Sequence, residues 1–274
     1  MPSLNSISAD KLLRLIGRPD CPALIDVQLD DDFAADPRLV PGAVRRPFDR
    51  VADWAPQFTG RSAVVICQKG LKLSQGVAAW LRQSGTPADT LEGGALAWAG
   101  AKLPMVPAQK LPKRDAQGRT LWVTRARPKI DRLACPWLIR RFVDPNAVFL
   151  YVNPSDVEGV GQRFGAAPFD IEGDGVTWTH RGELCTFDVM VQELGLATPA
   201  LSRLATIVRG ADTARLDLAP ESAGLLAVSL GLSRMHADDT AQLEAALPLY
   251  DALYRWCRDA SDEAHGWPPR KAGA

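Results

Sequence analysis

Short apolar runs alternate with helix-like spacing over the first hundred residues. ALIDV (23–27) and AVVIC (63–67) have the pattern of buried strands, and TLEGG (90–94) is the pattern of a strand that ends in a Gly-Gly turn. Residues 9–16 and 73–81 carry apolar side chains at helical spacing. Short apolar strands separated by helices predict an α/β domain, with a parallel sheet flanked by helices.

A different pattern begins after the polar, proline-rich segment PMVPAQKLPKRDAQGR (104–119), which is typical of a linker. The elements expected beyond it are a strand at 120–124, a helix at 131–142, strands at 148–152 and 176–180, and helices from residue 186 onward. Pro136 either lies in the first turn of a shorter helix begun near Cys135 or kinks a longer one. The second half is therefore predicted to be a helix-rich mixed α/β domain.

These patterns divide the 274 residues, of which 46% are hydrophobic, into two globular parts. We expect a first domain at 1–105, a linker at 106–119, a second domain at 120–264 and a tail at 265–274.

Charge and cysteine usage narrow the class of protein. Lys plus Arg equals Asp plus Glu at 32 each, so no global charge favours nucleic acid or a membrane surface. No apolar stretch approaches the roughly 18 residues of a membrane span, and the N-terminus lacks the pattern of a signal peptide. Five cysteines without a CxxC pair fit reduced thiols. We expect a soluble cytoplasmic protein that acts on small molecules.

Cys67 ends an apolar strand and is followed by the short loop QKGLK and then a helical pattern. Backbone N–H groups at a helix start, together with Lys69 and Lys72, can stabilise a thiolate, and Gly70 lets the loop curl around it. A cysteine at a strand end can equally be a small buried side chain. These residues alone leave a nucleophile and a structural cysteine both open.

Four motifs shift that balance, because they follow one another in the order found in the rhodanese, or sulfurtransferase, family. They are LIDVQLDDDF with Asp26, LVPGAVRRP with its Pro-Gly-Ala turn, CQKGLK, and LEGGALAWAGAKLP. Residues 5 to 105 therefore resemble a rhodanese-like domain.

The resemblance implies that Cys67 is a catalytic nucleophile that carries sulfane sulfur as a persulfide between a small-molecule donor and a thiol acceptor. It assigns substrate binding to the rest of the loop, Gln68, Lys69, Gly70, Leu71 and Lys72, and a structural role to Asp26. Many members have Arg where this chain has Lys72, and lysine cannot form a bidentate fork with an oxyanion. The resemblance therefore leaves two choices for the donor, thiosulfate or another sulfane-sulfur compound.

The second domain opens with a cationic stretch. Arg125 and Arg127 alternate at the end of the strand expected at 120–124, so they can share one side, with Lys129 close by. Guanidinium groups that converge in this way bind oxyanions or carboxylates. We interpret the three residues as a candidate anion site, for instance for chromate or sulfate.

His180, Glu183 and Cys185 lie within THRGELCTFD and are candidate metal ligands. Zinc and iron accept such a mixture of donors, although H-x2-E-x-C matches no standard motif. Asp212 and His236 could join them from elsewhere in the fold. The alternative is a hydrogen-bonded structural histidine, and no cofactor is required by the residues alone.

Residues 120 to 262 resemble the C-terminal domain of chromate-resistance protein B. The blocks that carry the resemblance include WVTRARPKIDRLACPWLIRRFVDP, HRGELCTFD and RGADTARLDLAPESAGLLAVSLGLSRMHADD. This resemblance implies a role in chromate resistance, and it assigns no catalytic residues.

The leading hypothesis is a sulfurtransferase that works through Cys67 and is coupled to a domain associated with chromate resistance. The alternative is a sensor or transcriptional regulator that responds to chromate or a metal and uses the rhodanese-like domain as a thiol module. In a third interpretation, the second domain is itself a redox or metal-dependent enzyme.

Overall fold

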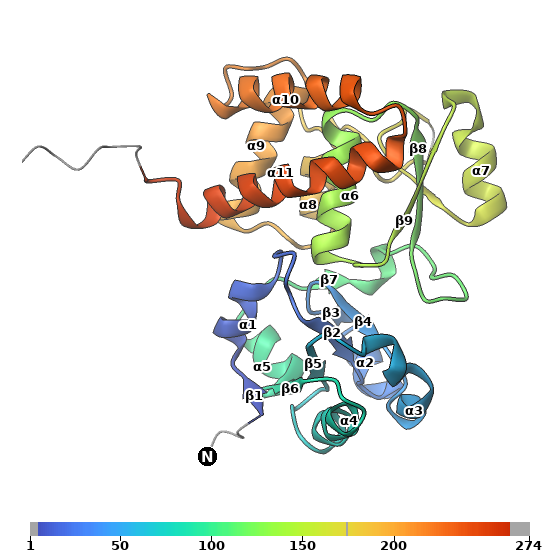
Figure 1. Cartoon of the computed structure of the whole chain (residues 1–274), viewed down its shortest axis with the longest axis vertical. Helices are drawn as coiled ribbons and strands as arrows, with labels where there is room; N and C mark the ends of the chain where they lie inside the picture. The colour runs from blue at the N-terminus through green and yellow to red at the C-terminus, as the bar shows by residue number, and fades with distance from the viewer. Residues whose placement is uncertain (1–4, 174, 264–274) are drawn as a thin grey trace, which may run out of the picture.

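The computed structural model describes residues 5–173 and 175–263, which form two packed domains (Figure 1). The predicted tail at 265–274 lies outside the described residues. Among the described helices, none is both long and apolar enough to cross a membrane.

The first domain is built on a five-stranded sheet in the order β1-β6-β5-β2-β4, and every neighbouring pair is parallel. Its strands are β1 (Ser6–Ile7), β2 (Ala23–Asp26), β4 (Ala43–Arg45), β5 (Ala63–Ile66) and β6 (Ala88–Leu91). Its helices are α1 (Ala9–Leu15), α2 (Asp30–Ala35), α3 (Val51–Trp54), α4 (Lys72–Gln83) and α5 (Gly94–Gly100). The predicted parallel sheet flanked by helices is confirmed.

Side chains alternate across this sheet and so divide the core in two. Val65 and Cys67 pack with α3 and α4 on one face. Val64 and Ile66 belong to a larger cluster on the other face, which contains α1, α5 and much of the second domain. The side chain of Cys67 therefore lies on the α4 side of the sheet.

The segment expected as a linker, 106–119, has structure of its own. β7 (Val106–Pro107) pairs antiparallel with β3 (Arg38–Leu39) of the first domain. Arg114 then donates to the fully buried Asp144 at 3.0 Å, and the same carboxylate accepts from the backbone N–H of Thr120 at 2.6 Å. The segment is therefore held to both domains.

The second domain combines a small parallel sheet, in the order β10-β8-β9, with a set of helices. The strands are β8 (Leu121–Arg125), β9 (Val148–Val152) and β10 (Ala167–Pro168). The helices are α6 (Ile130–Phe142), α7 (Val157–Phe164), α8 (Thr186–Glu193), α9 (Pro199–Asp212), α10 (Glu221–Met235) and α11 (Asp239–Asp259). The predicted helix-rich mixed α/β domain is confirmed.

Helix α6 continues through Pro136, so of the two alternatives the longer helix is present. Proline has no N–H, and the carbonyl of Arg132, four residues earlier, loses its helical donor. The hydroxyl of Tyr151 in β9 donates to this carbonyl at 3.2 Å. The strand thus supplies the hydrogen bond that the proline removes.

The strand expected at 176–180 is not present. Trp178 makes only an isolated bridge with Phe169, and the described residues around it form turns. Trp178 is nevertheless buried, and its ring lies 6.0 Å from that of Trp122. The apolar alternation that predicted a strand therefore reflects an irregular segment with buried aromatic side chains.

The two domains share one apolar core, because the cluster that holds Ile66 and Trp98 also holds Trp137, Phe142 and Tyr254. The backbone N–H of Gly42 donates to the carbonyl of Phe142 at 2.6 Å across the junction.

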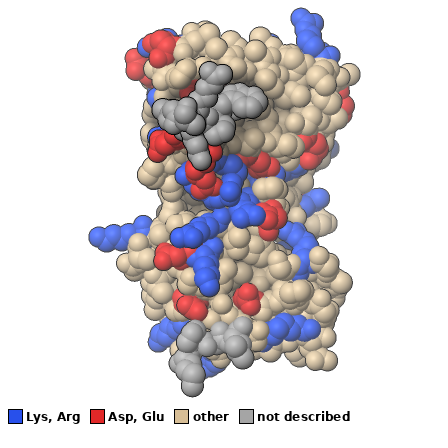
Figure 2. Space-filling model, turned by 60° about the vertical axis from the view of Figure 1, so that its left-hand side comes forward, with Lys and Arg blue, Asp and Glu red and all other residues tan. Residues whose placement is uncertain are grey.

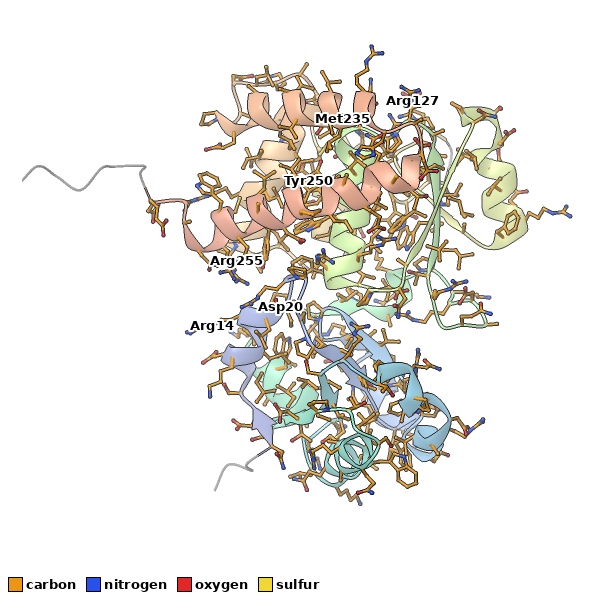
Figure 3. The ribbon with its side chains drawn as sticks, in the orientation of Figure 1. Arg14, Asp20, Arg127, Met235, Tyr250 and Arg255 are labelled. Atoms are coloured by element: carbon orange, nitrogen blue, oxygen red, sulfur yellow. The ribbon has the colours of Figure 1, made fainter. Side chains whose placement is uncertain are left out.

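Charged side chains surround this junction. Figure 3 places Arg14 and Asp20 of the first domain on one side of it and Arg255 of α11 on the other. The guanidinium of Arg258 donates to the carbonyl of Arg14 at 3.1 Å. Figure 2 shows Lys and Arg side chains gathered across the middle of one face, with acidic side chains beside them.

Gly17 tests how tightly the domains pack. It has a positive φ of 83°, and a Cβ there would overlap the rings of Phe142 and Tyr254. Gly17→Ala should lower the free energy of unfolding by about 2–5 kcal/mol, from left-handed strain plus overpacking. Urea denaturation of the full chain measures this.

Gly60→Ala is the matched control, since Gly60 has a φ of 80° but open space around its Cβ position. It should cost only the backbone strain of about 1–2 kcal/mol. Equal losses in the two variants would contradict close packing of Gly17 against the second domain.

Candidate functional sites: the Cys67 loop and the His180 cluster

Cys67 lies directly after β5, with only 5% of its surface exposed. Its thiol donates to the hydroxyl of Ser74 at 3.2 Å, and that hydroxyl donates to the carbonyl of Leu71 at 3.0 Å. Ser74 belongs to the first turn of α4, so the thiol sits at the beginning of this helix. Sequence reasoning missed Ser74, although a serine in the first turn after the loop was a usable signal.

The loop from Cys67 to Lys72 is held from behind by the Gly93-Gly94 turn. The N–H groups of Ala95 and Leu96 donate to the carbonyls of Cys67 and Gln68, both at 3.0 Å. Gly70 and Gly94 both have positive φ, and a Cβ on either would collide with the backbone of the other segment. Two glycines therefore let the two backbones approach closely.

The rim of this loop is cationic and partly apolar. Lys69 and Lys72 are exposed, and neither forms an ion pair with a described residue. Leu71 is 56% exposed at the end of the loop. The rim of the loop therefore combines two positive charges with one exposed apolar side chain.

Asp26 lies at the end of β2 and is buried. Its carboxylate accepts from the backbone and side-chain amides of Gln28, at 3.1 and 2.8 Å, and forms an ion pair of 3.2 Å with Arg45. Burial raises the pKa of Asp26 above its usual range, and the Gln28 hydrogen bonds oppose this rise. These contacts tie the ends of β2 and β4 together.

The candidate anion residues separate in the structure. Arg125 forms an ion pair of 3.5 Å with Asp170, whereas Arg127 and Lys129 line a pocket of about 610 Å³ with Arg234 of α10. Arg127 has a positive φ of 59°, and its N–H donates to the carboxylate of Asp239 at 3.1 Å. The backbone therefore turns sharply between Arg125 and Arg127.

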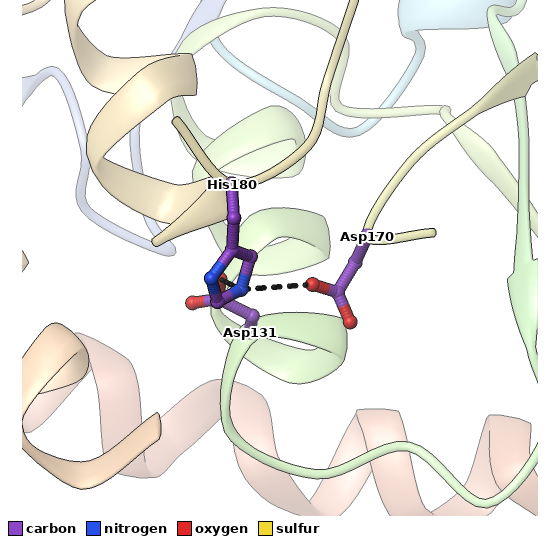
Figure 4. A group of neighbouring side chains, drawn as sticks. All are labelled: Asp131, Asp170 and His180. Atoms are coloured by element: carbon purple, nitrogen blue, oxygen red, sulfur yellow. Dashed lines mark ion pairs between the residues drawn. The ribbon is translucent and has the colours of Figure 1, made fainter. Parts of the chain in front are cut away.

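The second group is the His180 cluster, which we define as His180, Asp131, Asp170 and Asp212. The Nε2 atom of His180 lies 3.5 Å from an oxygen of Asp131, 3.5 Å from one of Asp170 and 3.3 Å from one of Asp212. Figure 4 shows the first two carboxylates directed at the imidazole. Four side chains from separate segments thus converge on one point.

Asp131, near the start of α6, is the deepest member of the cluster, at 1% exposed. One oxygen accepts from the N–H groups of Thr186 and Phe187, at 2.6 and 3.3 Å, at the start of α8. Its other oxygen, Oδ1, is buried without a hydrogen-bond partner among the described residues. Burial raises the pKa of Asp131 to about 7.

The pKa of His180 is raised as well, but by its neighbours and not by burial. The carboxylate of Asp131, and then those of Asp170 and Asp212, raise the pKa of His180 to about 12. The side chain is 43% exposed, so the cluster has a deep end at Asp131 and an open end at His180.

The other predicted ligands lie apart from this cluster. Glu183 is exposed, whereas Cys185 is buried and its thiol donates to Asp188 at 3.2 Å. Arg209 pairs with the same Asp188 at 2.9 Å. Burial raises the pKa of both Cys185 and Asp188. The structure therefore groups His180 with three aspartates, and His236 is not among the contacts of His180.

Asp131 and Asp170 were not singled out from the sequence. Each lies close to the end of a parallel strand, Asp170 two residues after β10 and Asp131 after the turn that follows β8. Carboxyl ends of neighbouring parallel strands meet at one edge of a sheet, which was a usable signal. Cys135, considered as a second thiol, is fully buried, and burial raises its pKa well above the usual range.

Comparison with known proteins finds different relatives for the two domains. Residues 122–257 match the family described as ChrB, C-terminal domain. Protein ChrB of Cupriavidus metallidurans is 36% identical over 156 residues, which cover 54% of this chain and 44% of that protein. The chain thus spans less than half the length of this curated relative.

Solved structures resemble the first domain. A rhodanese-like domain protein from Staphylococcus aureus is 27% identical over 35% of this chain and 91% of its own, with a TM-score of 0.32. A thiosulfate sulfurtransferase from Pseudomonas aeruginosa is 26% identical over 40% of this chain and 20% of its own, with a TM-score of 0.34. Both matches cover less than half of this chain.

The Gly94 contact gives a prediction for the loop. Gly94→Ala would push a methyl group into the carbonyls of Cys67 and Gln68 at a positive φ of 62°. We expect a loss of at least about 2 kcal/mol of unfolding free energy from the combined strain and overpacking. Thermal and urea unfolding measure the loss, and the rate of Cys67 alkylation should change as the loop is displaced.

Gly76→Ala in α4 is the control, since a Cβ there meets open space. It should raise stability by about 0.5–1 kcal/mol through helix propensity and leave Cys67 alkylation unchanged. A stable Gly94→Ala variant with normal Cys67 reactivity would rule out the proposed support of the loop.

Proposed function

Because residues 122–257 are a ChrB C-terminal domain and the preceding residues are rhodanese-like, we propose that this chain is a sulfurtransferase associated with chromate resistance. Its nucleophile is Cys67. The observation that carries the proposal is the loop itself, which begins with the Cys67 thiol at the start of α4 and is supported by the Gly93-Gly94 turn.

The proposed chemistry balances at sulfur. The Cys67 thiolate attacks the outer sulfur of a sulfane donor, a new S–S bond forms, and the bond within the donor breaks with its electron pair on the leaving group. For thiosulfate the leaving group is sulfite. A thiol acceptor then attacks the outer sulfur of the Cys67 persulfide and releases the Cys67 thiolate.

The residues of this chain have distinct proposed roles in these steps. Ser74 lies 3.2 Å from the sulfur and positions it, since its hydroxyl can turn from the Leu71 carbonyl to donate to a thiolate. Lys69 and Lys72 attract an anionic donor as point charges. Leu71 adds apolar surface at the rim, which favours a donor or acceptor with an apolar part.

The pocket lined by Arg127, Lys129 and Arg234 supports a second proposed element, the binding of a tetrahedral dianion such as sulfate or chromate. None of the three side chains forms an ion pair with a described residue, so their charges remain available. The backbone of Arg127 has a strained positive φ, and its N–H donates to the Asp239 carboxylate. This bond fixes the turn of the chain beside the pocket. We place the protein in the cytoplasm, where its five free cysteines would stay reduced.

Mass spectrometry tests the sulfurtransferase proposal. Incubation with thiosulfate, and in parallel with inorganic polysulfide, should add one sulfur atom to the Cys67 peptide. Cys67→Ser should lose this adduct and all sulfur transfer to cyanide, whereas Cys21→Ser, at a half-buried cysteine outside the loop, should behave as the wild type. Undiminished transfer by Cys67→Ser would remove Cys67 from the mechanism.

Anion binding is tested separately by calorimetry with sulfate and with chromate. Arg127→Ala should weaken binding at least about tenfold, because a charge-assisted hydrogen bond contributes roughly 1.5–3 kcal/mol. Arg163→Ala in α7, an arginine outside this pocket, should leave binding unchanged. Equal affinities of the two variants would exclude the pocket as the anion site.

A further inference from the structure

We propose that the His180 cluster binds one divalent transition-metal ion, ligated by His180 and by one carboxylate oxygen each from Asp131 and Asp170, whose donor atoms all lie within 4.8 Å of one another. Asp212 lies beside this set, with an oxygen 3.3 Å from His180 Nε2. This site differs from the H-x2-E-x-C set expected from the sequence, and it lies in the other domain from Cys67. The proposal does not depend on sulfur transfer.

The spacing of the atoms fits a metal better than a network of hydrogen bonds. The three oxygens lie 3.3 to 3.5 Å from Nε2, beyond the usual N–H···O range of about 2.7–3.2 Å. One N–H group can point at only one of three acceptors. Ligands bound about 2.1 Å from a tetrahedral metal stand about 3.4 Å apart, which is close to the distance from Nε2 to each of these oxygens.

The buried oxygen of Asp131 is the second observation. Oδ1 has no hydrogen-bond partner among the described residues, although the side chain is 1% exposed and its carboxylate is directed at the imidazole (Figure 4). An unpaired buried carboxylate oxygen costs a large desolvation penalty. The oxygen of Asp131 nearest to Nε2 is Oδ2, which already accepts from the N–H groups of Thr186 and Phe187. A cation that Asp131 binds through Oδ1 would therefore remove the penalty.

The carboxylates of Asp131 and Asp170 are also held by partners outside the cluster, as metal ligands usually are. The N–H groups of Thr186 and Phe187 hold Asp131. Asp212 accepts from the backbone N–H of Asp131 at 3.4 Å.

Asp170 is held in the same way. Its Oδ2 pairs with Arg132 at 3.2 Å and with Arg125 at 3.5 Å, while its Oδ1 accepts from the Thr186 hydroxyl at 2.8 Å and faces His180. The two arginines thus fix the carboxylate through the oxygen that faces away from the site.

The donor set selects the class of ion. Imidazole and carboxylate together suit Mn²⁺, Fe²⁺ and Zn²⁺, whereas Ca²⁺ and Mg²⁺ prefer oxygen alone. Three carboxylates around one imidazole also carry more negative charge than one divalent ion neutralises. The exposed side of His180 leaves a route for the ion to enter from solvent.

The test uses the full chain, stripped with EDTA and then titrated with Mn²⁺, Zn²⁺ or anaerobic Fe²⁺. Elemental analysis after gel filtration should find one equivalent of at least one of these ions, and the melting temperature should rise with its concentration because the ion binds only the folded state. His180→Ala should weaken binding by about 100-fold or more, since even indirect supports of a ligand change affinity by roughly 10–100-fold.

Controls separate this site from the alternatives. Glu183→Gln and His236→Ala should bind metal as the wild type does, and Cys67→Ser should too, which excludes Zn²⁺ on the loop thiolate. Because His180 is partly exposed, its variant should fold, and Asp170→Asn gives a second ligand variant of unchanged size; circular dichroism checks both. The proposal fails if the wild type retains none of the three ions, or if His180→Ala and Asp170→Asn both bind like the wild type.

Discussion

The buried carboxylate of Asp131 is the contact around which the second domain is organised. It accepts from two backbone N–H groups at the start of α8 and so fixes this helix against α6. The backbone N–H of Asp131 donates to Asp212 at the end of α9. Ionised groups are costly to bury unless they are paired or bind metal. Three helices and the His180 segment therefore meet at the Asp131 carboxylate and supply the groups that pair with it. This explains why an otherwise apolar core contains polar side chains at this position.

Both candidate sites follow one rule of parallel sheets, in which functional groups collect beyond the carboxyl ends of the strands. Cys67 comes directly after β5, and Asp170 comes two residues after β10. The sheet core supplies rigid strands up to the last apolar residue, and the loops that follow carry the chemistry. Two unrelated domains thus place their reactive groups in equivalent positions of the fold.

How much could be foreseen depended on whether a site is contiguous in the chain. The Cys67 loop lies within a few residues, so its thiol, glycine and lysines could be read together. The His180 cluster draws on four separated segments, and only the fold reveals that Asp131 and Asp170 approach one imidazole. The apolar alternation at 176–180 predicted a strand with one buried face. Trp178 is buried, but it is buried by packing against Trp122 and not in a strand of a sheet.

The junction at Gly17 and Phe142 has a thermodynamic consequence for both sites. Because one apolar core runs through both domains, neither can open without exposing part of the other's interior, and the two are expected to unfold as a single cooperative unit. Any ligand that binds only the native state therefore raises the free energy of unfolding of the whole chain. Occupancy at one end would therefore protect the other end from proteolysis and hydrogen exchange, without any change in shape passing between them.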